Sequence, residues 1–92
     1  MKYIWVIYFT NLPSVMTATT EEVAYEIMEA HIKNITELNL PVPGDPSKTV
    51  RDVYLEELAS DYERVLAGDA DDFGILDVCH AELAPLYDSF KS

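Results

Sequence analysis

Residues 3–9, with the sequence YIWVIYF, form the densest apolar stretch of the chain, and this stretch decides the fold. Seven residues are too few to cross a bilayer, which takes about 20, but they match the length and composition of a strand. Because strand side chains alternate, Trp5, Ile7 and Phe9 face one side, and the residues between them face the other. Both faces are apolar, so we predict a strand at the centre of a sheet, covered on both sides.

The composition indicates one small domain over residues 1–92, since a hydrophobic fraction of 49% is sufficient for a single core. The single cysteine, Cys79, excludes an internal disulfide and is typical of a reducing compartment. A secretory signal is the alternative interpretation of the N-terminal segment, with Lys2 as its basic start and residues 15–18 as its cleavage region. Its apolar core is short and rich in Tyr and Trp, so we expect a soluble cytoplasmic protein of a bacterial or other host cell.

The formal net charge is -11, from 17 acidic and 6 basic residues. Phosphate groups would be repelled by such a surface, so we expect no direct contact with nucleic acid or with an anionic membrane. The charge favours either a basic protein surface as partner or simple solubility.

The first half of the chain predicts a β-hairpin followed by a helix. Asn11-Leu12-Pro13 is typical of a turn, and residues 14–18 can return as a second strand. Thr19 and Glu22 have the spacing of a capping box, and the apolar residues after them recur at helical spacing, which predicts a helix over 20–37.

The second half begins with a connector, residues 40–48, which contains three prolines and a glycine and excludes a helix. Thr49, with Asp52 three residues later, predicts the start of a second helix over 50–67. Gly68 follows that helix in the position of a C-terminal glycine.

The segment from residue 73 to 83 fits either a helix or an irregular strand, and we favour a third strand over 73–82 because a lone hairpin is marginal. The predicted fold is therefore α+β: a small three-stranded antiparallel sheet in the order ββααβ, with the first strand central and two amphipathic helices on one face. The other face would be covered by residues 86–90 or by a second copy in a homodimer. We expect self-association through Trp5, Ile7 and Phe9.

Acidity is the strongest local feature after the first strand. On the second helix, Asp52, Glu56 and Glu63 line one ridge, at spacings of four and seven residues. Glu57 and Asp61 line the adjacent ridge together with Arg64, which is the one base from residue 52 to 72. Such a ridge can imitate the phosphate row of a nucleic acid and dock on a basic groove; the simpler interpretation is a solvated helix face. The predicted partner-binding residues are Asp52, Glu56, Glu57, Asp61, Glu63, Asp69, Asp71 and Asp72.

Motifs for a metal, a cofactor or catalysis are weak. Residues 69–77 resemble the start of an EF-hand loop, but Phe73 stands at position five and His80 replaces the required bidentate glutamate. Cys79 precedes His80, but neighbouring strand residues point to opposite faces, so a thiol–imidazole pair is disfavoured. His31 falls on the apolar side of the first helix. We expect no metal site, no cofactor and no catalytic residue, so the chain is predicted not to be an enzyme.

The predicted function is a protein-interaction module, an acidic inhibitor that mimics nucleic acid and binds a basic groove of a nucleic-acid-binding protein. In size and charge the chain is similar to phage-encoded viral antagonists of the anti-CRISPR and anti-restriction type, without a shared motif. The alternative is an assembly or regulatory subunit that associates through its apolar sheet face. A small enzyme built on clustered carboxylates is a third interpretation.

Overall fold

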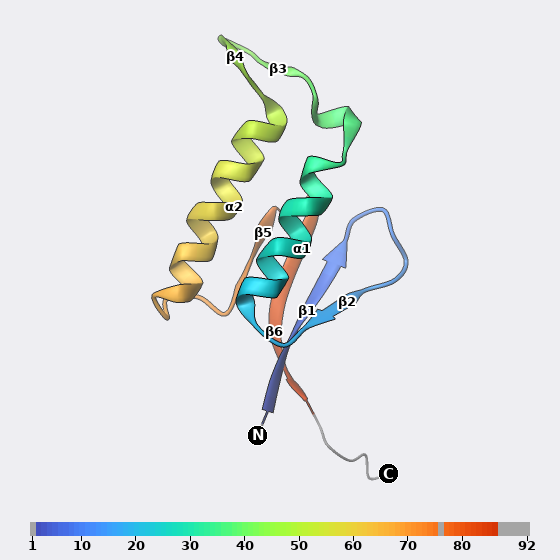
Figure 1. The fold of residues 1–92 in the computed structure, drawn as a ribbon, viewed down its shortest axis with the longest axis vertical. Coiled ribbons are helices and arrows are strands. Elements are labelled where there is room, and N and C mark those ends of the chain that lie inside the picture. The colour runs from blue at the N-terminus through green and yellow to red at the C-terminus, as the bar shows by residue number, and fades with distance from the viewer. Residues whose placement is uncertain (1, 76, 87–92) are drawn as a thin grey trace.

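A four-stranded antiparallel sheet carries two helices on one face (Figure 1). The computed structural model describes residues 2–75 and 77–86. The strand order in the sheet is β2-β1-β6-β5, and a separate two-stranded hairpin, β3-β4, joins the two helices. In chain order the elements are β1 (Lys2–Phe9), β2 (Met16–Ala18), α1 (Glu21–Lys33), a 3-10 turn (Thr36–Leu38), β3 (Pro41–Val42), β4 (Asp45–Thr49), α2 (Val50–Leu66), β5 (Asp72–Ile75) and β6 (Cys79–Leu86).

Strand β1 lies at the centre of the sheet, as its composition predicts. It pairs with β6 along its whole length, from Lys2 opposite Leu86 to Phe9 opposite Cys79. On its other side it pairs with the three residues of β2, with Val6 opposite Thr17. The predicted antiparallel hairpin at the N-terminus is therefore confirmed, although its second strand is short.

The predicted three-stranded ββααβ order is wrong, because the segment expected as one strand over 73–82 is a hairpin of two strands. The amide of Val78 donates to the carbonyl of Ile75 at 2.8 Å and closes the turn between β5 and β6. Phe73 and Ile75 alternate as strand residues, whereas Val78 and Cys79 are adjacent and both buried. What looked in the sequence like an irregularity within one strand is this turn.

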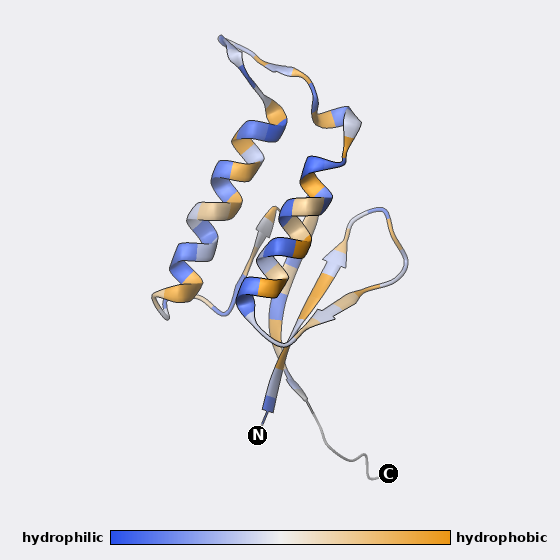
Figure 2. Ribbon diagram, viewed as in Figure 1, coloured by the Kyte–Doolittle hydropathy of each residue, from blue (hydrophilic) through white to orange (hydrophobic). Residues whose placement is uncertain are grey.

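Both helices pack on the same face of the sheet, and the core lies between them and β1. Trp5, Ile7 and Phe9 point into this core, where the ring of Trp5 meets the ring of Phe73 edge-on at 5.4 Å. Leu58 of α2 is fully buried there. Figure 2 shows hydrophobic residues concentrated on β1 and alternating with hydrophilic ones along both helices, as expected of elements with one apolar side.

The opposite face of the sheet is not covered by any described helix or strand, so the expectation that β1 is buried on both sides is wrong. Tyr8 is 42% exposed, and Ile4 and Val6 are only partly buried. Residues 87–90, which we expected to help cover this face, lie outside the described part of the chain. A strand with apolar residues on both faces can therefore still have one face partly exposed to solvent.

The helix ends differ from the prediction by a few residues. Thr20, instead of Thr19, caps α1, and its hydroxyl accepts from the amide of Val23 at 3.2 Å. The helix ends at Lys33, four residues earlier than predicted, and a short 3-10 turn follows. Helix α2 begins at the predicted residue and ends one residue early.

A Schellman motif ends α2. The amide of Gly68 donates to the carbonyl of Val65 at 3.0 Å, and the amide of Asp69 donates to the carbonyl of Arg64 at 2.9 Å. Gly68 adopts a φ of 81°, which a residue with a Cβ reaches only with strain. The predicted role of Gly68 as C-terminal glycine is confirmed.

Replacement of Gly74 by alanine should destabilise the fold more than the same change at Gly44. Both glycines have positive φ values, 148° and 84°. A Cβ at Gly74 would lie 2.5 Å from the carbonyl oxygen of Cys79 on β6, whereas a Cβ at Gly44 would meet nothing within 4 Å. We expect a loss of about 1–2 kcal/mol for Gly44→Ala and of more than about 3 kcal/mol for Gly74→Ala, measured by urea unfolding. Equal losses would contradict the close approach of β5 and β6.

Candidate functional site

Five of the predicted acidic residues lie on α2 and two lie in the loop after it, whereas Asp72 begins β5 and lies beside His80 on the uncovered sheet face. We call this set the acidic surface. All of its members are exposed except Asp61, which is half-buried. Leu58 and its neighbours turn the apolar side of α2 toward the sheet, so the carboxylates are left on the sides that meet solvent. The acidic surface comprises Asp52, Glu56, Glu57, Asp61, Glu63, Asp69, Asp71 and Asp72.

Asp52 has a structural role at the start of α2. Its carboxylate accepts the amide of Thr49 at 2.9 Å, while the amide of Asp52 donates to the Thr49 hydroxyl at 3.2 Å, which is a complete capping box. The backbone hydrogen bond from Thr49 is the main cause that lowers the pKa of Asp52. The capping predicted from the sequence is confirmed.

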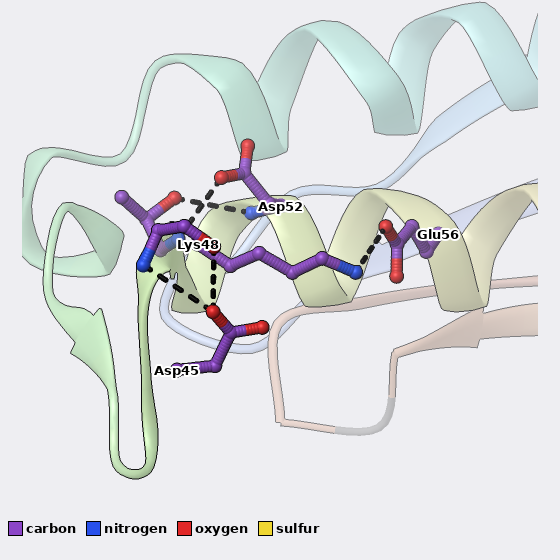
Figure 3. A network of polar contacts seen from close by, with 6 residues as sticks. Asp45, Lys48, Asp52 and Glu56 are labelled. Atoms are coloured by element: carbon purple, nitrogen blue, oxygen red, sulfur yellow. Dashed lines mark hydrogen bonds and ion pairs between the residues drawn. The ribbon is translucent and has the colours of Figure 1, made fainter.

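Glu56 is joined to the β3-β4 hairpin (Figure 3). The ammonium of Lys48 lies 3.0 Å from Oε1 of Glu56, and this contact is the main cause that raises the pKa of Lys48. In the same hairpin Ser47 donates from its amide and its hydroxyl to Asp45, and the hydroxyl bond is the main cause that lowers the pKa of Asp45. One of the few basic residues is therefore used to hold the hairpin against α2.

The rest of the acidic surface is largely uncompensated. Asp72 lies 3.8 Å from Nε2 of His80, an ion pair only when the imidazole is protonated. Glu57 and Asp61 stand four residues apart on α2, an arrangement of like charges that weakens a helix in isolation. The acids that make neither an ion pair nor a side-chain hydrogen bond with another described residue are Glu57, Asp61, Glu63, Asp69 and Asp71.

A contact between α1 and α2 brings acids of α1 near α2, which sequence reasoning did not predict. The rings of Tyr25 and Tyr62 stack between the two helices, with centroids 4.4 Å apart and planes 10° from parallel. Burial is the main cause that raises the pKa of Tyr62, and the nearby charges of Glu22, Glu21 and Glu26 raise it further. Glu22, Glu21 and Glu26 of α1 therefore lie near the Tyr62 ring, on the side of α2 that faces α1. The sequence shows that each helix carries acids but not that Tyr25 and Tyr62 bring the two helices into contact.

Arg51, although it is on α2, does not neutralise that surface. Its guanidinium donates to the backbone carbonyl of Ile32 at 3.3 Å and to that of Ile35. These carbonyls belong to the last turn of α1 and the residues after it, where a positive charge is favourable. The contact ties the start of α2 to the end of α1.

The uncovered sheet face carries a mixture of apolar and ionisable side chains. The hydroxyl of Tyr8 donates to Oε1 of Glu82 at 3.1 Å across the β1-β6 pair, and this bond is the main cause that raises the pKa of Tyr8. Glu82 stands directly opposite both Val6 on β1 and Asp72 on β5. The face is therefore less apolar than the composition of β1 alone suggests.

The structure places the residues expected to mediate self-association in the core. Trp5, Ile7 and Phe9 lie under the helices and are less than 10% exposed, so they are not available to a second copy. The reason is the alternation along β1, in which Ile4, Val6 and Tyr8 occupy the uncovered face. Any association through the sheet would use these three residues instead.

The cysteine and the histidines are separated. Cys79 is buried in the core, and burial raises the pKa of its thiol to about 11. His80 faces the opposite side of the sheet, next to Asp72, as alternation on a strand predicts. His31 packs edge-on against the ring of Phe9, with centroids 4.6 Å apart.

The segment that resembles an EF-hand loop continues into a strand. Asp72–Ile75 form β5, so this segment does not make the loop between two helices that an EF-hand requires. Within residues 2–75 and 77–86, no group of three or more His, Cys, Asp or Glu side chains is arranged to hold a metal ion.

Comparisons with known proteins matched no family model, no curated protein and no solved structure. Among the residues that the structure describes, none of the helices has the length and apolar character needed to cross a bilayer.

Replacing Asp52 with alanine should destabilise the protein in a pH-dependent way. Because the pKa of Asp52 is lowered by folding, its contribution is fully present above its ordinary pKa of about 3.9 and is lost as the pH falls through the folded value. The difference in urea midpoint between the wild type and Asp52→Ala should be largest near neutral pH and should shrink in acid. Glu63→Ala, an exposed acid of the same helix, is the control and should show a smaller effect. A pH-independent difference for Asp52→Ala would contradict the capping assignment.

Proposed function

We propose that the chain is a non-enzymatic interaction module whose acidic surface docks on the basic groove of a nucleic-acid-binding protein and inhibits it. The observation that carries this proposal is the set of carboxylates on α2 and the following segment, of which Glu57, Asp61, Glu63, Asp69 and Asp71 make no ion pair with another described residue, with Arg64 as the one base among them. A partner's lysines and arginines would supply the missing positive charges.

Three of the few basic residues already have partners, although one of them, Lys48, compensates a member of the acidic surface. Lys48 pairs with Glu56, Arg51 binds carbonyls at the end of α1, and Lys33 lies 3.5 Å from Glu29. Arg64 is the one base near Glu57, Asp61 and Glu63, so the net field of these residues stays negative and can act on a partner. Such a field speeds association with a basic surface and repels nucleic acid.

The two-helix arrangement favours a docking surface with more than one row of charge. Tyr25 and Tyr62 hold the helices together, and Glu22, Glu21 and Glu26 of α1 lie near Tyr62 of α2, so both helices can contribute negative charge. A groove that normally holds a nucleic-acid backbone presents basic residues to several phosphates at once. In size and charge the chain is similar to phage-encoded antagonists, and inhibition by mimicry is the activity that this likeness suggests.

Reversing two charges of the acidic surface should abolish partner binding while the fold survives. Glu57→Lys/Asp61→Lys changes the net charge from -11 to -7, since each replacement adds two units. Immobilised wild-type chain should retain a basic protein from a lysate of the source cell, and the retained amount should fall at least about tenfold for this variant. Binding should also weaken steeply between low and high salt, and duplex DNA should displace the retained protein.

The matched control is Glu37→Lys/Asp77→Lys, which changes the net charge equally but lies away from the acidic surface. It should retain the partner, because the proposal depends on the position of the charges. If both variants lost partner binding equally, the loss would follow from net charge alone, and docking through α2 would be refuted. Circular dichroism spectra identical to the wild type establish that both variants are folded.

A second candidate function, assembly through the uncovered sheet face, is favoured by one observation. Ile4, Val6 and Tyr8 form a partly exposed row on β1 that no described element covers. Apolar rows of this kind are common at subunit interfaces. In this alternative the acidic surface serves solubility.

The alternative predicts self-association that persists at high salt and is lost in Val6→Lys. The new lysine would stand opposite Glu82, so the monomer should keep its fold. Leu66→Lys, which removes an exposed apolar side chain from α2, is the control and should still associate. Sedimentation equilibrium at low and high salt measures the self-association of each variant. A wild-type chain that is monomeric at both salt concentrations would exclude the alternative.

A further inference from the structure

A cavity of about 420 Å³ lies at the C-terminal end of α1, and none of its lining residues belongs to the acidic surface. Three separate parts of the chain line it: the loop after β1, the end of α1 with the 3-10 turn that follows, and the turn between β5 and β6. No residue of α2 lines the cavity. Its volume is in the range of small-molecule sites, which is about 300–1,000 Å³.

The walls of the cavity are fixed by contacts to the sheet and to α2. The ring of His31 is held against Phe9 of β1. The amide of Thr10 donates to the carbonyl of Val78 at 3.1 Å, which joins the loop after β1 to the β5-β6 turn. Arg51 of α2 donates a hydrogen bond to the carbonyl of Ile35. A cavity whose walls are tied to rigid elements is formed before a ligand arrives, which favours binding.

The lining combines apolar side chains with negative charge. Leu12, Ile35, Leu38 and Val78 contribute hydrocarbon, and Leu12 is 52% exposed although it is apolar. Asp77 and Glu37 are exposed acidic residues of the lining, and the hydroxyl of Thr36 donates to Oε2 of Glu37 at 3.4 Å. His31 adds an imidazole, and the described lining residues include no lysine or arginine. A metal ion would need several oxygen or nitrogen ligands in place of this hydrocarbon.

We propose that this cavity binds a small amphipathic organic cation, an amine or guanidine with an apolar group of several carbons. The apolar group would lie against the hydrocarbon lining, and the cationic group would lie near Glu37 and Asp77. An anion of the same size would meet two carboxylates in a protein of charge -11 and would be repelled. The inference is independent of the proposed function, because it uses neither α2 acids nor a protein partner.

The test is a titration of ¹⁵N-labelled protein with hexylamine, followed by NMR. Saturable shifts should be confined to the amides of the lining residues, and hexanoate, which has a chain of the same length and the opposite charge, should bind at least about tenfold more weakly. Glu37→Gln/Asp77→Asn should weaken hexylamine binding several-fold. Glu57→Gln/Asp61→Asn removes the same number of charges from the acidic surface and should leave the binding unchanged.

A second titration distinguishes a free amine from a basic side chain of a protein. The probe is the blocked peptide acetyl-Leu-Lys-Leu-amide, with acetyl-Leu-Glu-Leu-amide as its control. Binding of hexylamine, with or without the lysine peptide, supports the proposal. Binding of the peptide alone would overturn the small-molecule assignment. Three results would overturn the cation site itself. They are no localised shifts with either hexylamine or the lysine peptide, binding of hexanoate as tight as that of hexylamine, and an unchanged hexylamine affinity in Glu37→Gln/Asp77→Asn.

Discussion

The antiparallel register between β1 and β6 is the constraint on which the rest of the structure depends. It joins the two ends of the described chain over eight residue pairs and puts the N-terminal strand in the middle of the sheet. The register also decides which side chains are buried: Trp5, Ile7 and Phe9 share a face with Cys79 and Ala81, and the helices cover that face. A shift by one residue would move the whole apolar set to solvent.

The location of the charge follows from this arrangement. Both helices pack on the same sheet face (Figure 1) and turn their apolar sides toward it, so the acids of α2 are left on the sides that meet solvent. Two basic residues near α2 are used internally, Arg51 at the end of α1 and Lys48 on Glu56, and Arg64 is the one other base on α2. The uncompensated charge is therefore a consequence of how the fold uses its few cations as much as of composition.

Local chemistry made part of the fold predictable from the sequence. The capping box of Thr49 and Asp52, the C-terminal glycine Gly68 and the central strand are each encoded within a few residues, and the structure confirms them. The β5-β6 hairpin was missed because its turn has no strong Gly or Pro signal, and Gly74 lies within the strand. Burial of β1 on both sides was inferred from composition, but coverage depends on how many helices the chain supplies. The contact between Tyr25 and Tyr62 and the cavity beside His31 bring distant segments together, and no local pattern encodes such contacts.

The central claim, that β1 has one face under the helices and one face open, is tested most directly by thiol labelling at adjacent positions. Single cysteines would replace Val6 and Ile7 in separate variants, and the rate of reaction with a maleimide would be measured under native conditions. The native Cys79 is buried with a thiol pKa of about 11, so the wild-type chain should react slowly and serve as the blank. The account predicts fast labelling at position 6 and labelling near the blank rate at position 7. Similar rates at both positions, or the reverse order, would contradict it.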